Sequence, residues 1–84
     1  MATTKEDIVG WIKRGKEQEA QFLIIVCDTF DHEDYPVFCK DASECKKQYE
    51  NHNGKNMQRI MEVYDLRKEI DPQLNRARSI EVPW

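Results

Sequence analysis

An uninterrupted apolar segment in the first third of the chain is the clearest structural signal in the sequence. Residues 22–27 read Phe-Leu-Ile-Ile-Val-Cys, which is too short for a typical helix. A short segment that is apolar at every position and rich in β-branched residues is typical of a central strand covered on both faces. We therefore expect a buried strand here, at the centre of the fold.

A second strand is expected from Tyr35 to Lys40, after a short acidic stretch. The connection between the two apolar segments suits a β-hairpin with a longer loop. Pro36 lacks the N–H that a strand donates to its neighbour. We therefore expect this strand to begin at a sheet edge, or to place Pro36 where its nitrogen faces away from the partner strand.

Polar residues that cap helices precede the periodic apolar positions near the N-terminus. Thr3 or Thr4 can cap a first helix, because a capping side chain satisfies backbone N–H groups of the first turn. Ile8, Trp11 and Ile12 follow with the i, i+3, i+4 spacing of one apolar helix face. The pattern predicts an amphipathic helix that packs on the sheet.

Two further helices are expected in the second half of the chain. Asp41 can cap one of them, which ends at the turn residues 51–54. Asp71 and Pro72 then open a short final helix, with Asp71 as the cap and Pro72 at the first helical position.

The segment from Met57 to Leu66 fits two structures. As a helix its apolar residues fall on one face, and as a strand its apolar and polar residues alternate. We favour a strand, because Gly54 marks a turn before it and Val63 and Tyr64 are strand formers. A third strand would also stabilise the hairpin, which is marginal in isolation.

The expected elements follow the order α-β-β-α-β-α. With 84 residues, the chain is expected to form a single domain over residues 1–84. We predict a small α+β layer fold with a three-stranded, mostly antiparallel sheet and helices on at least one face. A chain of this size buries only about 60–65% of its unfolded surface, so a deep pocket within one subunit is not expected.

Composition narrows the kinds of partner and compartment. The 13 Lys and Arg residues and 16 Asp and Glu residues give a net charge of −3, so nucleic acid is not expected as a partner. We expect no signal peptide and no membrane span, because no apolar segment has the required length, and we predict a cytoplasmic location. The 3 cysteines are an odd number, which favours reduced thiols over a disulfide framework.

The connection between the first two strands gathers negative charge. Four carboxylate residues fall within seven sequence positions, namely Asp28, Asp31, Glu33 and Asp34, and Phe30 lies among them. Mutual repulsion of carboxylates is relieved by a cation or by a basic partner. Acidic residues also fill solvated turns that bind nothing, since Asp is favoured in turns. A solvated turn, a partner-binding surface and a metal site therefore remain open.

The leading functional hypothesis is a non-enzymatic binding or regulatory module that recognises a protein partner, either as a monomer or as a homodimer. Aromatic side chains framed by charge are typical anchors of interfaces. Trp84 is a second candidate anchor, although packing back over the sheet fits it equally well. The expected partner-binding residues are Asp28, Phe30, Asp31, Glu33, Asp34 and Trp84.

The alternative hypothesis is a small-ligand or divalent-metal site on the same loop. Asp28, Asp31 and Asp34 would be the ligands of Mg²⁺ or Ca²⁺, and a minimal hydrolase would be the catalytic form of this hypothesis. The spacing is not that of an EF-hand loop. The cysteines and histidines match no common zinc motif, so we otherwise expect no cofactor and assign no catalytic residue.

Two blocks of sequence support a resemblance that covers most of the chain. Residues 26–37 read VCDTFDHEDYPV and residues 56–66 read NMQRIMEVYDL. With these blocks, the chain resembles a family of small uncharacterised proteins of bacteria and their mobile elements. That family has no assigned activity, cofactor or catalytic residues. The resemblance therefore implies a bacterial or phage origin, where small acidic proteins often act as accessory or inhibitory binders.

Overall fold

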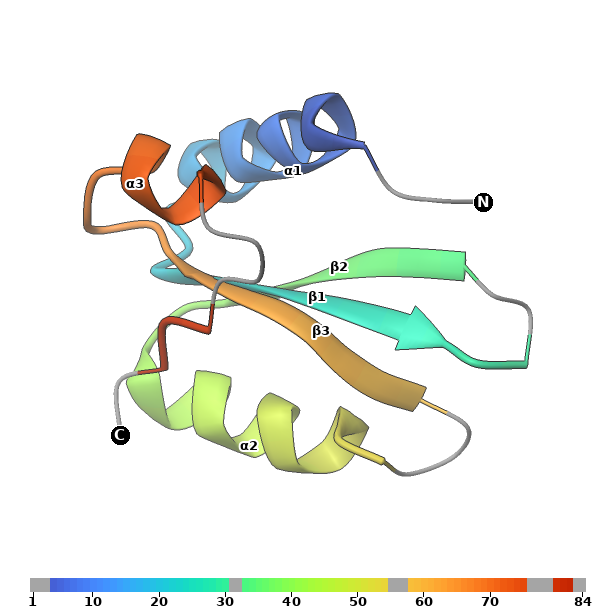
Figure 1. Ribbon diagram of the computed structural model, residues 1–84. Coiled ribbons are helices and arrows are strands. Elements are labelled where there is room, and N and C mark those ends of the chain that lie inside the picture. The colour runs from blue at the N-terminus through green and yellow to red at the C-terminus, as the bar shows by residue number, and fades with distance from the viewer. Residues whose placement is uncertain (1–3, 31–32, 55–57, 76–79, 83–84) are drawn as a thin grey trace.

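The computed structural model describes residues 4–30, 33–54, 58–75 and 80–82. Three helices and three strands occupy this part of the chain in the predicted order, which confirms the α+β class (Figure 1). They are α1 (Lys5–Glu17), β1 (Phe22–Asp28), β2 (Glu33–Cys39), α2 (Ala42–His52), β3 (Gln58–Asp65) and α3 (Asp71–Leu74). Within these ranges no helix is both long enough and apolar enough to cross a bilayer.

The sheet has the order β2-β1-β3, and β1 runs antiparallel to both neighbours. Residues 22–26 of β1 are each exposed by 1% or less, so the predicted central strand is confirmed. The strand interpretation of the segment after Gly54 is also correct, because β3 covers residues 58–65. β2 lies at an edge of the sheet, as the presence of Pro36 predicted.

Helices cover both faces of the sheet, with α1 and α3 on one face and α2 on the other (Figure 1). Because side chains alternate along a strand, β1 supplies residues to both faces. The core on the α2 face comprises Phe22, Ile24, Val26, Cys39, Cys45, Ile60 and Val63. The core on the α1 face comprises Ile8, Ile12, Leu23, Ile25, Tyr64 and Leu66.

Short polar side chains define where the two longer helices begin. The Thr4 hydroxyl accepts a hydrogen bond from the Asp7 N–H at 3.2 Å, and the Asp7 carboxylate accepts one from the Thr4 N–H at 3.1 Å. Thr4 is therefore the cap of α1, and the alternative Thr3 lies outside the described residues. The Asp41 carboxylate accepts from the Glu44 N–H at 2.8 Å and caps α2, as predicted.

The start of α3 differs from the sequence prediction by one residue. Asp71 is the first helical residue rather than the cap, and Ile70 holds the cap position without a side-chain hydrogen bond. The pattern of Asp followed by Pro located the helix correctly. Its exact register depends on the packing of Ile70 against the α1-face core, which the local sequence does not encode.

At Gly15, α1 packs closely against side chains from the sheet side of the core. A Cβ atom on Gly15 would lie 2.7 Å from Leu66 Cδ1 and 3.1 Å from Phe38 Cδ1. Both distances are shorter than ordinary van der Waals contact, so a side chain here would require Leu66 and Phe38 to move within the core. A Cβ atom on Gly10, in the same helix, would meet nothing within 4 Å.

The two glycines of α1 provide a matched pair of substitutions. Exchange to alanine gains helix propensity of roughly 0.5–1 kcal/mol at either position, so the difference between them isolates the packing effect. We expect Gly15→Ala to be less stable than Gly10→Ala by about 1–3 kcal/mol, the usual cost of overpacking. Urea unfolding followed by circular dichroism measures this difference, and equal stabilities would contradict the close packing of α1 at Gly15.

Candidate functional site

Three of the predicted acidic residues, Asp28, Glu33 and Asp34, lie at the turn end of the β1–β2 hairpin. In the strand register Asp28 is opposite Glu33, and Cys27 is opposite Asp34. Residues directly opposite each other share a face of the sheet, and successive residues alternate between faces. Val26 belongs to the core on the α2 face, so Asp28, two positions later, and its opposite residue Glu33 lie on that face too. Asp34 lies on the α1 face.

Phe30 is the most exposed large apolar side chain of the hairpin end, with 72% of its surface accessible. Its position is held by the turn, because the Phe30 N–H donates to the Asp28 carboxylate at 2.9 Å. Asp and Asn side chains often stabilise turns through such a bond to the residue two positions later. An exposed aromatic residue therefore lies two positions after Asp28, whose carboxylate its backbone N–H contacts.

Tyr35 connects the hairpin end to β3 and α2. The Gln58 side-chain amide donates to the Tyr35 hydroxyl at 2.6 Å, and the rings of Tyr35 and His52 meet edge to face with centroids 6.3 Å apart. His52 in turn places Nδ1 at 2.8 Å from the Gln48 carbonyl oxygen. Burial, and then the charge of Asp28, raise the pKa of Tyr35 above its ordinary value. These contacts make the α2 side of the hairpin end a well-supported surface.

Cys27 lies on the α1 face between Asp34 of β2 and Arg59 of β3. Burial raises the pKa of the Cys27 thiol, and the neighbouring Asp34 raises it further against the opposing effect of Arg59. Because the thiolate is the nucleophilic form of cysteine, this environment does not activate Cys27. The cysteine is a packing residue at the margin of the core.

The predicted metal ligands are not brought together by the described residues. Asp28 and Asp34 lie on opposite faces of the hairpin, and Asp31 lies outside the described residues, as does Trp84. Among the residues that the structure describes, no group of three His, Cys, Asp or Glu side chains is placed to hold a metal ion. A Mg²⁺ or Ca²⁺ site that includes Asp31 stays a prediction.

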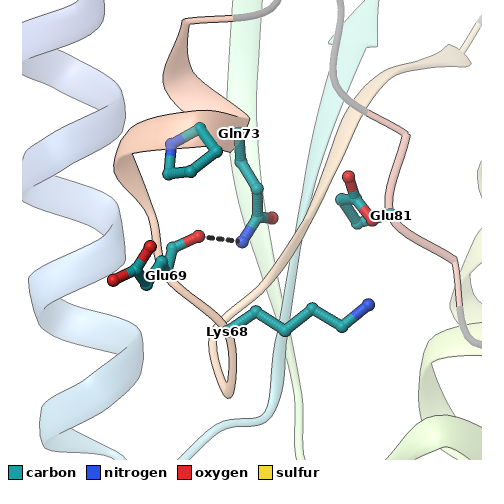
Figure 2. A pocket seen from close by; sticks show the side chains of 5 residues that line it. Lys68, Glu69, Gln73 and Glu81 are labelled. Atoms are coloured by element: carbon teal, nitrogen blue, oxygen red, sulfur yellow. Dashed lines mark hydrogen bonds between the residues drawn. The ribbon is translucent and has the colours of Figure 1, made fainter.

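A pocket of about 400 Å³ lies at the other end of the molecule, between α3 and the C-terminal segment (Figure 2). It is lined by Lys68, Glu69, Pro72, Gln73 and Glu81. No pattern in the sequence indicates this pocket, because its walls come from a turn, a short helix and a distant segment that only the fold brings together. Its charged side chains are of mixed sign and lie mostly at the surface.

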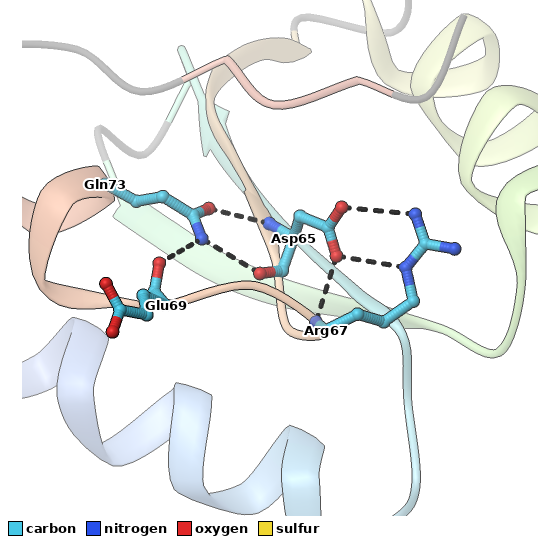
Figure 3. A network of polar contacts seen from close by, with 4 residues as sticks. All are labelled: Asp65, Arg67, Glu69 and Gln73. Carbon is cyan, nitrogen blue, oxygen red and sulfur yellow. Dashed lines mark hydrogen bonds and ion pairs between the residues drawn. The ribbon is translucent and has the colours of Figure 1, made fainter.

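Gln73 forms the polar wall of this pocket, but its side chain is already engaged (Figure 3). Its oxygen accepts from the Asp65 N–H at 2.8 Å, and its nitrogen donates to the carbonyl oxygens of Asp65 at 2.9 Å and Glu69 at 2.8 Å. Only 3% of Gln73 is exposed. The amide thus replaces a neighbouring strand at the outer edge of β3, which makes Gln73 a structural residue.

The Asp65 carboxylate joins the same network from the end of β3. It accepts from the Arg67 backbone N–H at 2.9 Å and from the Arg67 guanidinium through two bonds of 3.1 Å (Figure 3). The guanidinium also lies 4.8 Å above the ring of Phe22. Burial by itself would raise the pKa of Asp65, but the bonds and charge of Arg67 outweigh it and lower that pKa.

Removal of the Gln73 amide should destabilise the fold. In Gln73→Ala the buried N–H and C=O of Asp65 lose their partners, and each unsatisfied buried group costs about 1–3 kcal/mol. We expect a loss of roughly 2–5 kcal/mol in the free energy of unfolding. Asn75→Ala, an exposed change just after α3, is the control and should leave stability nearly unchanged. Similar stabilities of the two variants would contradict the conclusion that the Gln73 amide satisfies the backbone groups of Asp65 at the edge of β3.

The lowered pKa of Asp65 predicts a loss of stability in acid. The unfolded state takes up a proton near the ordinary pKa of about 4, whereas the folded state resists it, so stability falls as pH drops below that range. In Arg67→Gln this acid dependence should be weaker, because the carboxylate loses the opposite charge. Chemical unfolding between pH 6 and pH 2 tests this, with the exposed Arg14→Gln as control. An unaltered pH profile in Arg67→Gln is the contrary outcome.

Four of the predicted partner-binding residues are therefore described and lie together at the hairpin end, namely Asp28, Phe30, Glu33 and Asp34. No family model, curated protein or solved structure matches the chain.

Proposed function

We propose that this protein is a non-enzymatic binding module that recognises a protein partner through the turn end of its β1–β2 hairpin. The exposure of Phe30 is the observation that carries the proposal. Aromatic side chains have few rotatable bonds, and their burial supplies a large part of an interface's energy. The Asp28 carboxylate holds that turn through its bond to the Phe30 N–H.

Charge at the hairpin end supports a basic partner. Asp28 and Glu33 are directly opposite each other, and like charges in this arrangement destabilise a strand pair. Lys or Arg side chains of a partner would relieve this repulsion. The net charge of −3 acts in the same direction at longer range, because it accelerates encounters with positively charged surfaces.

Partner binding agrees better with the geometry than the divalent-metal alternative. A metal site would have to draw Asp28 and Asp34 onto one ion from opposite faces of the hairpin. A protein interface has no such requirement, since a partner that contacts the hairpin end can reach both faces. We further propose that the module acts in the cytoplasm, where its three free cysteines would stay reduced.

Capture from bacterial extract with the immobilised protein tests this function. Wild type, Phe30→Ala and Val9→Ala serve as parallel baits, because Val9 is the matched control: an exposed apolar residue on α1. Truncation of a central aromatic anchor costs about 2 kcal/mol or more. We therefore expect Phe30→Ala to weaken binding of the captured protein by at least about 30-fold, and Val9→Ala to bind like wild type.

The charge component is measured with the captured protein in a binding assay over a range of salt concentrations. Glu33→Gln should slow association and reduce its salt dependence, because steering acts mainly on the association rate. A captured protein that binds wild type and Phe30→Ala equally well would refute the hairpin as the recognition surface. So would the absence of any protein enriched by wild type over Phe30→Ala.

A further inference from the structure

The two edges of the sheet differ in how their backbone groups are covered by other segments. Along the outer edge of β3, the Val63 carbonyl accepts from the Glu81 N–H at 2.9 Å, and the Gln58 carbonyl accepts from the Gly54 N–H at 2.9 Å. The Gln73 amide covers the backbone of Asp65 at the same edge. Three separate segments thus cover this edge, whereas in the described part of the chain β2 has a strand neighbour only on the β1 side.

The register identifies which backbone groups of β2 face outward. The Gln21 N–H donates to the Cys39 carbonyl at 2.9 Å, so Cys39 at the end of β2 directs its carbonyl toward the β1 side. Backbone direction alternates along a strand, so the odd-numbered residues of β2 face β1 and the even-numbered ones face the outer edge. Pro36 and Phe38 are opposite Ile25 and Leu23, which leaves their backbone groups directed to the open edge.

Side chains along this edge are suited to a second strand of particular chemistry. Val37 and Phe38 lie on opposite faces of β2 and are only half-buried, so apolar residues of an added strand would complete their packing. Glu33 and Asp34 likewise lie on opposite faces at the hairpin end. An added strand would therefore meet acidic side chains on both faces there, and two consecutive basic residues fit that position.

We infer that the partner adds an extended strand to the outer edge of β2, with two consecutive basic residues beside Glu33 and Asp34 and apolar residues beside Val37 and Phe38. This inference rests on the proposed function and specifies its binding mode, since strand addition is a common way to recognise an extended segment. A second copy of β2 fits less well. Each copy would bring its own Pro36, which lacks a donor, and its own net negative charge.

Peptide titration with amide exchange measured by NMR tests the edge directly. The probe is the blocked peptide Val-Val-Thr-Thr-Lys-Lys, which in an antiparallel alignment places its two valines beside Phe38 and Val37 and its basic residues at the hairpin end. The control peptide ends in Glu-Glu. We expect the Lys-Lys peptide to slow exchange of the Phe38 N–H by at least about tenfold at saturation, because that group becomes hydrogen-bonded. The Val37 N–H, which faces β1, should change little.

Two variants separate backbone pairing from charge. Pro36→Val restores an outward donor, and one added hydrogen bond should tighten binding of the Lys-Lys peptide about twofold to tenfold. The double exchange of Glu33→Lys and Asp34→Lys should weaken it by about tenfold, since two favourable cross-strand pairs become repulsive. Thermal unfolding of each variant confirms that the fold persists before binding is compared.

Three results would overturn the inference. One is the absence of binding by the Lys-Lys peptide, and another is an unchanged affinity in Pro36→Val. The third is a change in the NMR chemical shifts of Phe30 and Glu33 without slower exchange of the Phe38 N–H. That result would contradict strand addition but not the proposal that the hairpin binds a partner. Failure of the hairpin proposal is recognised separately, because the captured partner would then bind Phe30→Ala as tightly as wild type.

Discussion

The burial of β1 on both faces is the constraint on which the rest of this structure depends. Five consecutive side chains from Phe22 to Val26 are almost fully removed from water, and each such burial stabilises the fold by about 1.5–3 kcal/mol. A strand covered in this way needs a helix layer on each side and a strand on each edge. The placement of α1, α2, β2 and β3 follows from that requirement (Figure 1).

The proposed binding surface lies where this burial ends. The apolar run stops at Cys27, and the next residue, Asp28, has its carboxylate bound to the turn that presents Phe30. The same strand therefore supplies the rigid support and, in its last residue, the start of the exposed loop. Binding residues are commonly carried by loops that a rigid scaffold positions.

The two edges of the sheet differ in how the chain covers them. At the outer edge of β3, Gln73 and Glu81 satisfy backbone groups that a further strand would otherwise occupy. That edge is closed by the chain itself, and the neighbouring pocket is a consequence of the closure. Among the described residues, β2 has a strand neighbour on the β1 side alone, which is why the proposed strand addition is assigned to its outer edge.

Local pattern was sufficient for the elements, because hydrophobic periodicity, caps and turn residues act over a few positions. It predicted the central strand and the strand after Gly54. It assigned Glu33 and Asp34 to the loop, whereas β2 begins at Glu33 rather than at Tyr35. Only the tertiary structure decided that Asp28 and Asp34 lie on opposite faces, since a face depends on strand register. The tertiary structure alone also brought the Gln73 side chain to the backbone of Asp65 at the outer edge of β3. No local pattern specifies the proximity of these two segments.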